Sequence, residues 1–372
     1  MITVDVLALR EALKKVGLSV SVRTTLPITN SVLLDNKDNV LSVTGTNLET
    51  AVIATLPCIG ESLSFCLPYK ILNQFVSKGA GSITLTPKED NKSVVLERSK
   101  IGTMNIWCGR REDFPPIPKM KNTIWSKLGA KEVCRLFGIV LPGCAKDESR
   151  LVLTGVCCRD GEIASADGFR LYNAKSEKFN FGLGELPHTM DKDTKIIPAR
   201  TISEVIKIFG KLGEMQVVFD DSMVSFKTHD CTLVSQLIQG TYPKYEQLIP
   251  KEFSSKVSFS VPLMVERLNL MDLSMGSGFL RLITGKEGTE DILNIRGGSQ
   301  DLGQEEAMYD LTLPCKSEGV DARIGFNCKY FMDAIKSFSL CNLEMANPTS
   351  PGKFTGDIEG LVVILMPGFL QW

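Results

Sequence analysis

Histidine, the side chain most often used for acid–base chemistry near neutral pH, occurs only at positions 188 and 229. Two histidines this far apart in the sequence offer little material for a catalytic pair or a zinc site. The adjacent carboxylates Asp220 and Asp221 lie between two short apolar runs, a position typical of a hairpin turn rather than of paired acid–base groups. A phosphate-binding loop is also missing, because Gly285-Lys286 lacks the upstream glycine at the required spacing. These patterns predict a protein without a catalytic site, a metal or a cofactor.

The overall composition is that of a folded chain with little net charge. Of its 372 residues, 43% are apolar and 23% charged, and the length suits two or three cores. Lys and Arg number 42 and Asp and Glu number 43, so the formal net charge is −1. A net charge this close to zero therefore excludes a protein that coats a polyanion through its overall charge, and any basic surface has to be local.

Sorting and redox signals favour a cytoplasmic protein. Asp5 interrupts the first apolar stretch, which argues against a secretory signal. The apolar run 360–370 is too short to span a bilayer and contains Pro367. The eleven cysteines include no C-x-x-C pair, so we expect reduced and mostly buried thiols. The signals together predict a cytoplasmic location and no membrane association.

One pattern occurs three times: a short apolar strand leads through Pro or Asn and a basic residue into a helix. Aligning Pro68, Pro198 and Asn327 within the three copies gives spacings of 130 and 129 residues. The copies are 65–75, 196–206 and 324–334. Such a period indicates repeated structural units.

Amphipathic segments near 6–16, 131–141 and 262–272 repeat with nearly the same period. Between the helices lie short alternating runs, which are typical of antiparallel strands. Examples are 82–86, 93–97, 216–219, 223–227 and 361–365. The sequence therefore predicts an α+β chain of three repeated domains. Their expected bounds are 1–125, 126–253 and 254–372.

Positive charge is concentrated in the six expected helices, which together carry +7 while the rest of the chain carries −8. The helices are 6–16, 70–78, 131–141, 200–212, 262–272 and 329–338. In the fourth helix, Arg200 and Lys207 lie opposite the apolar stripe. Thr201 and Glu204 have the spacing of a capping box, which predicts that this helix starts there. One basic helix face is usually only a solvated surface. Six such helices in an otherwise acidic chain favour a layer that faces a polyanion.

A series of short motifs runs along the three-fold layout of the chain. The motifs are Thr25-Leu-Pro-Ile28, Val43-Thr-Gly-Thr-Asn-Leu-Glu49, Glu112-Asp-Phe-Pro115, Ala166-Asp-Gly-Phe-Arg-Leu171, Ile197-Pro198, Gly240-Thr-Tyr-Pro-Lys-Tyr245, Ile324-Gly-Phe-Asn327 and Met366-Pro367. In this order and layout the chain resembles the bacterial DNA polymerase III beta subunit family, the sliding clamps. The resemblance covers essentially its full length.

The resemblance implies a DNA clamp fold, with two helices packed on antiparallel sheets in each domain and a six-domain ring made by a head-to-tail homodimer. It implies a processivity factor that encircles double-stranded DNA without reading its sequence. The implied partners are the DNA polymerase catalytic subunit, the clamp loader and other proteins with a clamp-binding motif. By family position, Arg23 and Arg150 are implied duplex contacts. The helix-face charges add Lys14, Lys70, Arg200, Lys207 and Lys329.

The resemblance also implies a small apolar cleft that receives side chains of an extended partner peptide. Carried over to this sequence, its wall would be Leu153, Ala166, Leu171, Pro243, Leu248, Ile364 and Met366, and its rim Gly168, Phe169, Arg170 and Pro367. Leu153 and Ile364 fit ordinary core positions equally well. Phe169 follows an Asp-Gly turn signal and should be exposed.

Met104 and Ile106, on an expected edge strand of the first domain, are the implied ring-closing residues, together with Leu273 of the third domain. Asp272 occupies a position that is commonly apolar in the family, which predicts easier ring opening.

Three further departures from the family concern partner preference. Ala166 replaces a usual threonine, Gln247 replaces a frequent arginine, and Gln371-Trp372 extends the usual terminus. The added indole could line or obstruct the cleft.

Two other functions are compatible with the residues alone. A pseudo-threefold scaffold that binds only proteins would share the repeats, and retention on closed circular DNA separates it from a clamp. An enzyme using Asp167 or Asp220 as a catalytic carboxylate would lack a partner base, a metal cluster and a phosphate loop. Turnover abolished by Asp167→Asn would support the enzyme.

Overall fold

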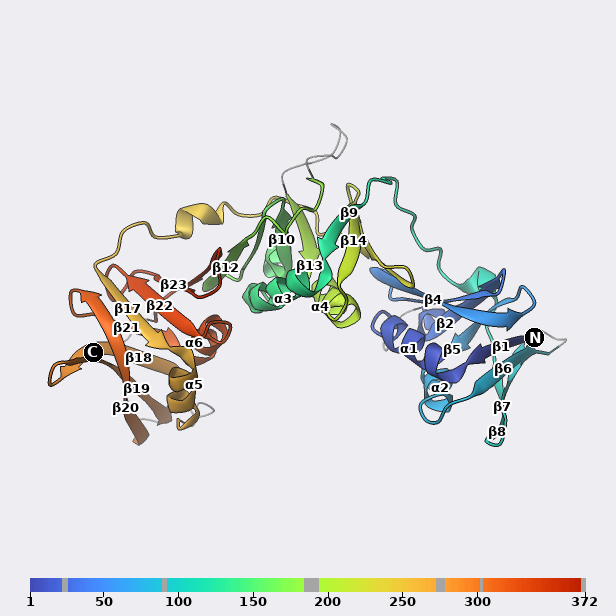
Figure 1. The fold of residues 1–372 in the computed structure, drawn as a ribbon, viewed down its shortest axis with the longest axis horizontal. Helices are drawn as coiled ribbons and strands as arrows, with labels where there is room; N and C mark the ends of the chain where they lie inside the picture. The colour runs from blue at the N-terminus through green and yellow to red at the C-terminus, as the bar shows by residue number, and fades with distance from the viewer. Residues whose placement is uncertain (22–25, 89–91, 184–193, 272–277, 302–303, 369–372) are drawn as a thin grey trace. The chain divides into compact units, whose positions relative to one another are not determined.

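The computed structural model describes residues 1–21, 26–88, 92–183, 194–271, 278–301 and 304–368. They form helices and antiparallel sheets in two compact units, each built from two segments of the chain (Figure 1). Unit 1 comprises Met1–Arg135 and Asn180–Gln239, and unit 2 comprises Leu136–Phe179 and Gly240–Trp372. None of the described helices is long and apolar enough to cross a membrane.

The predicted helices are confirmed, with ends that differ by a few residues. Within the described residues the α-helices are α1 (Val6–Val16), α2 (Tyr69–Phe75), α3 (Ala130–Val140), α4 (Ala199–Phe209), α5 (Val261–Asn269) and α6 (Cys328–Ile335). The second members of the three pairs begin at 69, 199 and 328, which reproduces the predicted spacings of 130 and 129.

Unit 1 contains one branched antiparallel sheet, on which α1 packs against β3 and β4. Its strands are β1 (Ile2–Asp5), β2 (Ser31–Lys37), β3 (Val40–Thr46), β4 (Thr50–Gly60), β5 (Ser64–Pro68), β6 (Ser82–Pro87), β7 (Ser93–Arg98), β8 (Gly102–Trp107), β9 (Ser126–Gly129), β14 (Glu214–Phe219), β15 (Met223–Lys227) and β16 (Cys231–Gln236). The main path runs β8-β7-β6-β1-β4-β16-β15-β14-β9, and β3, β2 and β5 branch from β4. The β4–β16 ladder, with Val52 opposite Leu233, therefore joins segments far apart in sequence.

Unit 2 has a second antiparallel sheet, in the order β10-β11-β12-β24-β23-β22-β17-β20-β19-β18-β21. These strands are β10 (Gly155–Arg159), β11 (Glu162–Ala166), β12 (Arg170–Lys175), β17 (Ser255–Ser260), β18 (Phe279–Glu287), β19 (Glu290–Asp301), β20 (Gln304–Gly319), β21 (Arg323–Asn327), β22 (Leu340–Met345), β23 (Gly352–Gly356) and β24 (Leu361–Leu365). Helix α6 packs on β21 and β24, where Phe326, Phe331 and Phe354 form a buried aromatic cluster. The β12–β24 ladder joins the chain near 170 to its C-terminal region.

The predicted capping box at the start of α4 is wrong. The helix begins at Ala199, after β13 (Lys195–Pro198), and no side chain caps its N-terminus. Thr201 instead bonds the Ser235 hydroxyl at 2.7 Å, and Glu204 is buried beside Arg200. Both side chains face the unit interior, so tertiary contacts override the local capping pattern.

The predicted hairpin turn at Asp220-Asp221 is confirmed between β14 and β15. The buried Asp220 carboxylate accepts the backbone N–H groups of Lys121 and Asn122 at 2.6 and 2.7 Å. Asp220 therefore anchors the segment that precedes β9. The structure gives this carboxylate a structural role.

The cysteines match the expectation of buried thiols. Ten of the eleven are buried, and only Cys315 is partly exposed. Burial raises the pKa of Cys66 and of Cys134 to about 12, which keeps both sulfurs protonated and unreactive near neutral pH. No group of three or more His, Cys, Asp or Glu side chains in the described ranges could hold a metal ion.

Candidate functional site

The turn between β11 and β12 projects Phe169 into solvent. The Asp167 carboxylate accepts the N–H groups of Phe169 and Arg170 at 2.9 and 3.0 Å, which fixes the turn. Gly168 has φ +93°, a conformation that strains any residue with a Cβ. As the Asp-Gly signal predicts, Phe169 is 61% exposed.

Phe169 lies beside the aromatic ring of Tyr330, which belongs to the first turn of α6. The two ring centroids are 6.3 Å apart and tilted by 36°. The Asn327 side chain caps α6 by accepting the Tyr330 N–H at 3.2 Å, so the cap also sets the position of the tyrosine. The Met366 N–H donates to the Phe169 carbonyl at 2.8 Å just beyond the β12–β24 ladder.

These elements enclose an apolar pocket of about 490 Å³. It is lined by Gly168, Phe169, Phe279, Asn327, Tyr330, Thr349, Met366, Pro367 and Gly368. Gly368 approaches the Phe279 ring so closely that an added Cβ would lie 2.2 Å from a ring carbon. Aromatic walls with exposed backbone suit the capture of one or two apolar side chains from an extended peptide.

The pocket contains some of the predicted residues and adds others. Gly168, Phe169, Met366 and Pro367 line it as expected. Leu153, Leu171 and Ile364 are buried instead; Leu171 and Ile364 pair in the β12–β24 ladder, which turns their side chains into the core. Pro243 and Leu248 are exposed but lie outside this lining, and Ala166 is half-buried at the end of β11. Gln371 and Trp372 fall outside the described residues.

Phe279, Asn327, Tyr330 and Thr349 are pocket residues that the sequence did not predict. Asn327 was recognisable as part of the Ile324-Gly-Phe-Asn327 motif, and Tyr330 follows this cap within one helical turn. Phe279 carries no such signal, because only the β18–β21 register places it opposite Asn327.

Arg170, predicted at the pocket rim, is the centre of a buried ionic network. It is 7% exposed and contacts Asp167 through Nε at 2.9 Å and Asp333 of α6 through Nη1 at 3.1 Å. Its guanidinium also lies 4.2 Å from the centroid of the Tyr330 ring. Arg170 therefore joins the β11–β12 turn to α6 and fixes the aromatic residues of the pocket.

Replacing Arg170 with methionine is expected to lower the free energy of unfolding of unit 2 by about 3 kcal/mol, because two mostly buried carboxylates lose their shared cation. Urea unfolding followed by circular dichroism measures the change. Arg296→Met is the matched control, since the Arg296–Asp310 pair has a similar separation of 3.0 Å but is about half exposed. An equal loss in both variants would contradict this role for Arg170, because exposed pairs contribute less than about 1 kcal/mol.

The same network sets a pH dependence. Burial alone would raise the pKa of Asp333, but Lys336 and Arg170 outweigh burial and hold this pKa below the ordinary 3.8. A carboxyl whose folded pKa is lowered stabilises the protein above its unfolded pKa, and this contribution disappears as the pH falls through the folded value. The difference between wild type and Arg170→Met should therefore shrink below about pH 4.

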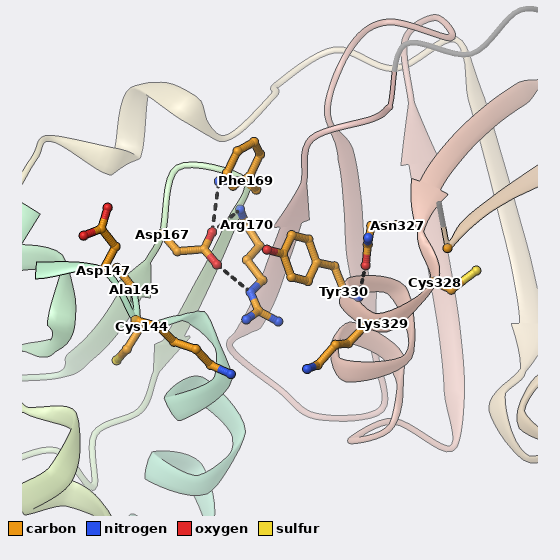
Figure 2. Close-up of a pocket in the computed structure, with 12 residues that line it drawn as sticks. Cys144, Ala145, Asp147, Asp167, Phe169, Arg170, Asn327, Cys328, Lys329 and Tyr330 are labelled. Carbon is orange, nitrogen blue, oxygen red and sulfur yellow. Dashed lines mark hydrogen bonds and ion pairs between the residues drawn. The ribbon is translucent and has the colours of Figure 1, made fainter. Parts of the chain in front are cut away.

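A second, polar pocket of about 770 Å³ adjoins the Phe169–Tyr330 pair (Figure 2). It is lined by Cys144, Ala145, Lys146, Asp147, Asp167, Phe169, Arg170, Gly278, Asn327, Cys328, Lys329 and Tyr330. The two pockets share Phe169, Asn327 and Tyr330. The aromatic pair is thus the boundary between them.

The structure separates the predicted DNA-contacting side chains into two kinds. Lys14, Lys70, Lys207 and Lys329 are exposed and have no hydrogen-bond or ion-pair partner among the described residues. Arg200 donates from Nε to the buried Glu204 at 3.2 Å, so it compensates a buried carboxylate.

The two predicted arginines outside the helices differ in what the structure describes of them. Arg150 is exposed, and its Nη1 lies 3.6 Å from where a Cβ on Gly168 would sit. Arg23 lies outside the described residues.

A shallow basic hollow of about 680 Å³ lies between α3 and α4 in unit 1. Its lining includes Lys131, Arg135 and Lys211, and Arg135 is paired with Glu132 at 3.1 Å. Lys131 and Lys211 are exposed lysines without a partner in the described part of the chain. The sequence analysis counted both lysines in the helix charge, and Lys211 lies on the basic face of the fourth predicted helix, but neither was among the predicted DNA contacts.

The edge strand predicted to close a ring is present as β8, which ends the sheet of unit 1 within the described ranges. Ile106 is only 5% exposed and packs into its own unit, whereas the next residue, Trp107, is 62% exposed. Met104 is half-buried, and Leu273 and Asp272 lie outside the described residues. The strand register therefore presents Trp107, rather than Ile106, to any partner at this edge.

Comparison with known proteins gives a consistent result. Models of the central and C-terminal domains of the DNA polymerase III beta subunit match residues 127–244 and 246–356, together more than half of the chain. The beta sliding clamp of Staphylococcus aureus is 24% identical over 345 residues, covering 88% of this chain and 87% of that protein.

Solved structures show the same fold. The DNA polymerase sliding clamp of Bacillus subtilis superposes with a TM-score of 0.88 at 20% identity, covering 100% of this chain and 99% of that one. The DNA polymerase III beta subunit of Thermotoga maritima gives 0.85 at 22% identity, with 100% of both chains covered.

Proposed function

The chain belongs to the DNA polymerase III beta subunit family, and from this premise we propose that it is a DNA sliding clamp. It encircles duplex DNA as a head-to-tail homodimer in the cytoplasm. It has no catalytic step of its own and tethers the polymerase catalytic subunit, the clamp loader and other proteins with a clamp-binding motif. Lys and Arg contact phosphates without reading bases, so neighbouring registers are nearly equal in energy and the ring slides.

The observation that carries this proposal is the three-fold repeat of helix pairs, with exposed lysines that have no partner in the described part of the chain, in a protein whose net charge is −1. Two copies would supply twelve helices. With a helix diameter of about 10 Å, their ring would have a circumference of roughly 120 Å and an opening of roughly 28 Å. Such an opening admits a duplex with a layer or two of water.

We propose three domains, 1–125, 126–253 and 254–372. The family models support the first limit, since one match begins at 127, whereas the other begins at 246, eight residues before the second limit. The ladders β4–β16 and β12–β24 cross the two proposed boundaries. This explains why compactness alone divides the central domain between the two units.

The partner pocket is proposed to combine the apolar pocket with the exposed Leu248 and Pro243, and DNA contacts are proposed for Arg23, Arg150 and the exposed helix lysines. Leu153, Ala166, Leu171 and Ile364 are buried or half-buried, and we propose that they form the floor of this cleft.

Retention on DNA tests the proposal. Protein loaded onto a nicked circular plasmid by the clamp loader of the same organism should co-elute with the circle in gel filtration. It should be released when a restriction enzyme linearises the DNA, because topological linkage is lost. Equal retention on circular and linear DNA, or none on either, would favour the protein-only scaffold.

Changing Lys131, Lys207 and Lys211 together to glutamine should weaken binding to a short linear duplex. Their α3–α4 surface would contact phosphates, so the slope of log K against log salt should fall by roughly 2–3 between about 50 and 200 mM salt. Fluorescence anisotropy measures the affinity for the duplex and, from its values at several salt concentrations, the slope. The control changes Lys37, Lys88 and Lys100, three exposed lysines on strands or turns, and should leave the slope unchanged. Identical slopes in the two triple variants would assign the phosphate contacts elsewhere.

A further inference from the structure

One buried carboxylate on α4 is held by hydroxyl groups from the N-terminal part of unit 1. The Glu204 side chain is 5% exposed, and its Oε2 accepts the Ser19 hydroxyl at 3.2 Å. Ser19 follows α1, is fully buried, and accepts the hydroxyl of Thr50 at the start of β4 at 3.2 Å. The carboxylate is therefore fixed where α4 meets the end of α1 and the start of β4, all of them in unit 1.

The same carboxylate holds an arginine one helical turn earlier. Arg200 donates from Nε to Glu204 Oε1 at 3.2 Å, and its side chain is 54% exposed. Its two Nη groups have no hydrogen-bond or ion-pair partner among the residues that the structure describes. The donors of a guanidinium lie in one rigid plane, so a bond at Nε restricts the direction in which the Nη donors point.

The arginine cannot leave this carboxylate without a cost. Burial raises the pKa of the Glu204 carboxyl above its ordinary value of 4.5. Arg200 opposes this rise most strongly, followed by the hydroxyls of Ser19 and Thr50. A buried carboxylate that loses its cation becomes an uncompensated charge, which is strongly unfavourable. The pair therefore stays together when a second anion approaches, and that anion meets the Nη edge of the guanidinium.

The free edge of Arg200 lies on the basic side of α4. Lys207 follows two helical turns later and is exposed, so both side chains project from the same side of the helix. A lysine is a mobile point charge, whereas an arginine held at Nε offers a planar fork that matches two oxygens of one phosphate. Arg200 is therefore suited to a directional phosphate contact that the exposed lysines cannot make.

We propose that Glu204 is a positioning residue for the DNA contact of this protein, because it holds Arg200 with both Nη groups free to bind one backbone phosphate. Ser19 and Thr50 hold Glu204 in turn. The inference rests on the proposed function and adds a directional contact to the lysines of that surface. It also ties this contact to the junction of two proposed domains, since the two hydroxyls belong to the first domain and the carboxylate to the second.

Binding of a short linear duplex to the full-length protein, measured by fluorescence anisotropy, tests this role. Glu204→Met removes a negative charge together with the group that holds Arg200. Charge alone would tighten binding, whereas loss of positioning should weaken it about threefold. Glu204→Gln should restore at least wild-type affinity, because its amide oxygen still accepts from Arg200 Nε and its amide nitrogen can donate to Ser19. Glu97→Met, which removes the same charge at an exposed position of β7, should not weaken binding.

Arg200→Lys separates positioning from a purely structural role of Glu204. Lysine keeps the charge but has no fork, so Arg200→Lys should weaken binding as much as Glu204→Met does. Adding Glu204→Met to Arg200→Lys should not weaken binding further, because the two residues act through one contact. Arg200→Gln removes the charge as well and should also lower the slope of log K against log salt by about 1.

The outcomes separate positioning from charge and from folding. A Glu204→Met protein that binds at least as tightly as wild type overturns the positioning role. A loss that Glu204→Gln does not restore, or that adds to the loss in Arg200→Lys, assigns Glu204 to folding and overturns it too. An unchanged salt slope in Arg200→Gln removes Arg200 from the phosphate contacts. If wild type is not retained on circular DNA although this variant pattern holds, the clamp proposal fails while the Arg200 contact stands.

Discussion

Replacing Phe169 with aspartate is expected to weaken partner-peptide binding by about 50-fold or more, since aromatic residues at the centre of small pockets dominate such interfaces. Phe169 forms a wall of the apolar pocket and stands against Tyr330. The new carboxylate would place a charge against Met366 and Phe279 without a partner for it. Folding should be unaffected, because the side chain is 61% exposed and the turn is held by the Asp167 carboxylate, which accepts the residue-169 N–H, and by the positive φ of Gly168.

Fluorescence anisotropy with a labelled partner peptide that ends in two apolar residues measures the affinity, and primer extension on a circular template measures the processivity lost by the polymerase. Leu340→Asp is the matched control, because Leu340 is an apolar residue of unit 2 with a similar exposure of 52% that does not line the pocket. Phe169→Asp should still be retained on circular DNA, because encirclement does not depend on the pocket. Wild-type affinity in Phe169→Asp would place partner binding elsewhere.

The repeat, the helices and several strands were predictable because they depend on local periodicity. The bounds of α1 (Val6–Val16) and of β15 (Met223–Lys227) match the predicted segments residue for residue. The start of α4 was placed correctly to within a residue for an incorrect reason. Thr201 and Glu204 have the spacing of a capping box, but both contact buried groups of the tertiary structure.

The candidate site was only half predictable, because strand register decides which side chains reach it. The Asp167-Gly168 turn is a local signal and correctly exposes Phe169. Ile364 is buried because of its pairing with Leu171, and Phe279 enters the pocket because it pairs with Asn327. A shift of one residue in either ladder would reverse these assignments. No spacing in a single sequence encodes this long-range register.

The alternation of side chains between the two faces of a strand also changes the expected ring interface. β8 ends its sheet, so one row of its backbone groups is available for pairing, and an exposed tryptophan on such an edge is typical of a protein interface. Ile106 and Trp107 are adjacent and therefore point to opposite faces of the strand. Since Ile106 packs inward, Trp107 is the side chain of this edge that a second copy would bury.

Trp107→Glu is therefore expected to convert the proposed dimer into monomers, raising the dimer Kd by about 100-fold or more, because it removes a large apolar anchor and buries an unpaired charge. Analytical ultracentrifugation down to nanomolar concentration measures the Kd, and the wild-type value tests whether Asp272 weakens the ring. Trp107→Phe should retain most of the dimer, and Ile59→Glu, at an exposed apolar position of β4, should leave it intact.

Because an open ring is not topologically linked, Trp107→Glu should also leave circular DNA as readily as linear DNA. Its affinity for the partner peptide should be unchanged. A Trp107→Glu protein that stays dimeric and is retained on circles would remove β8 from the ring interface.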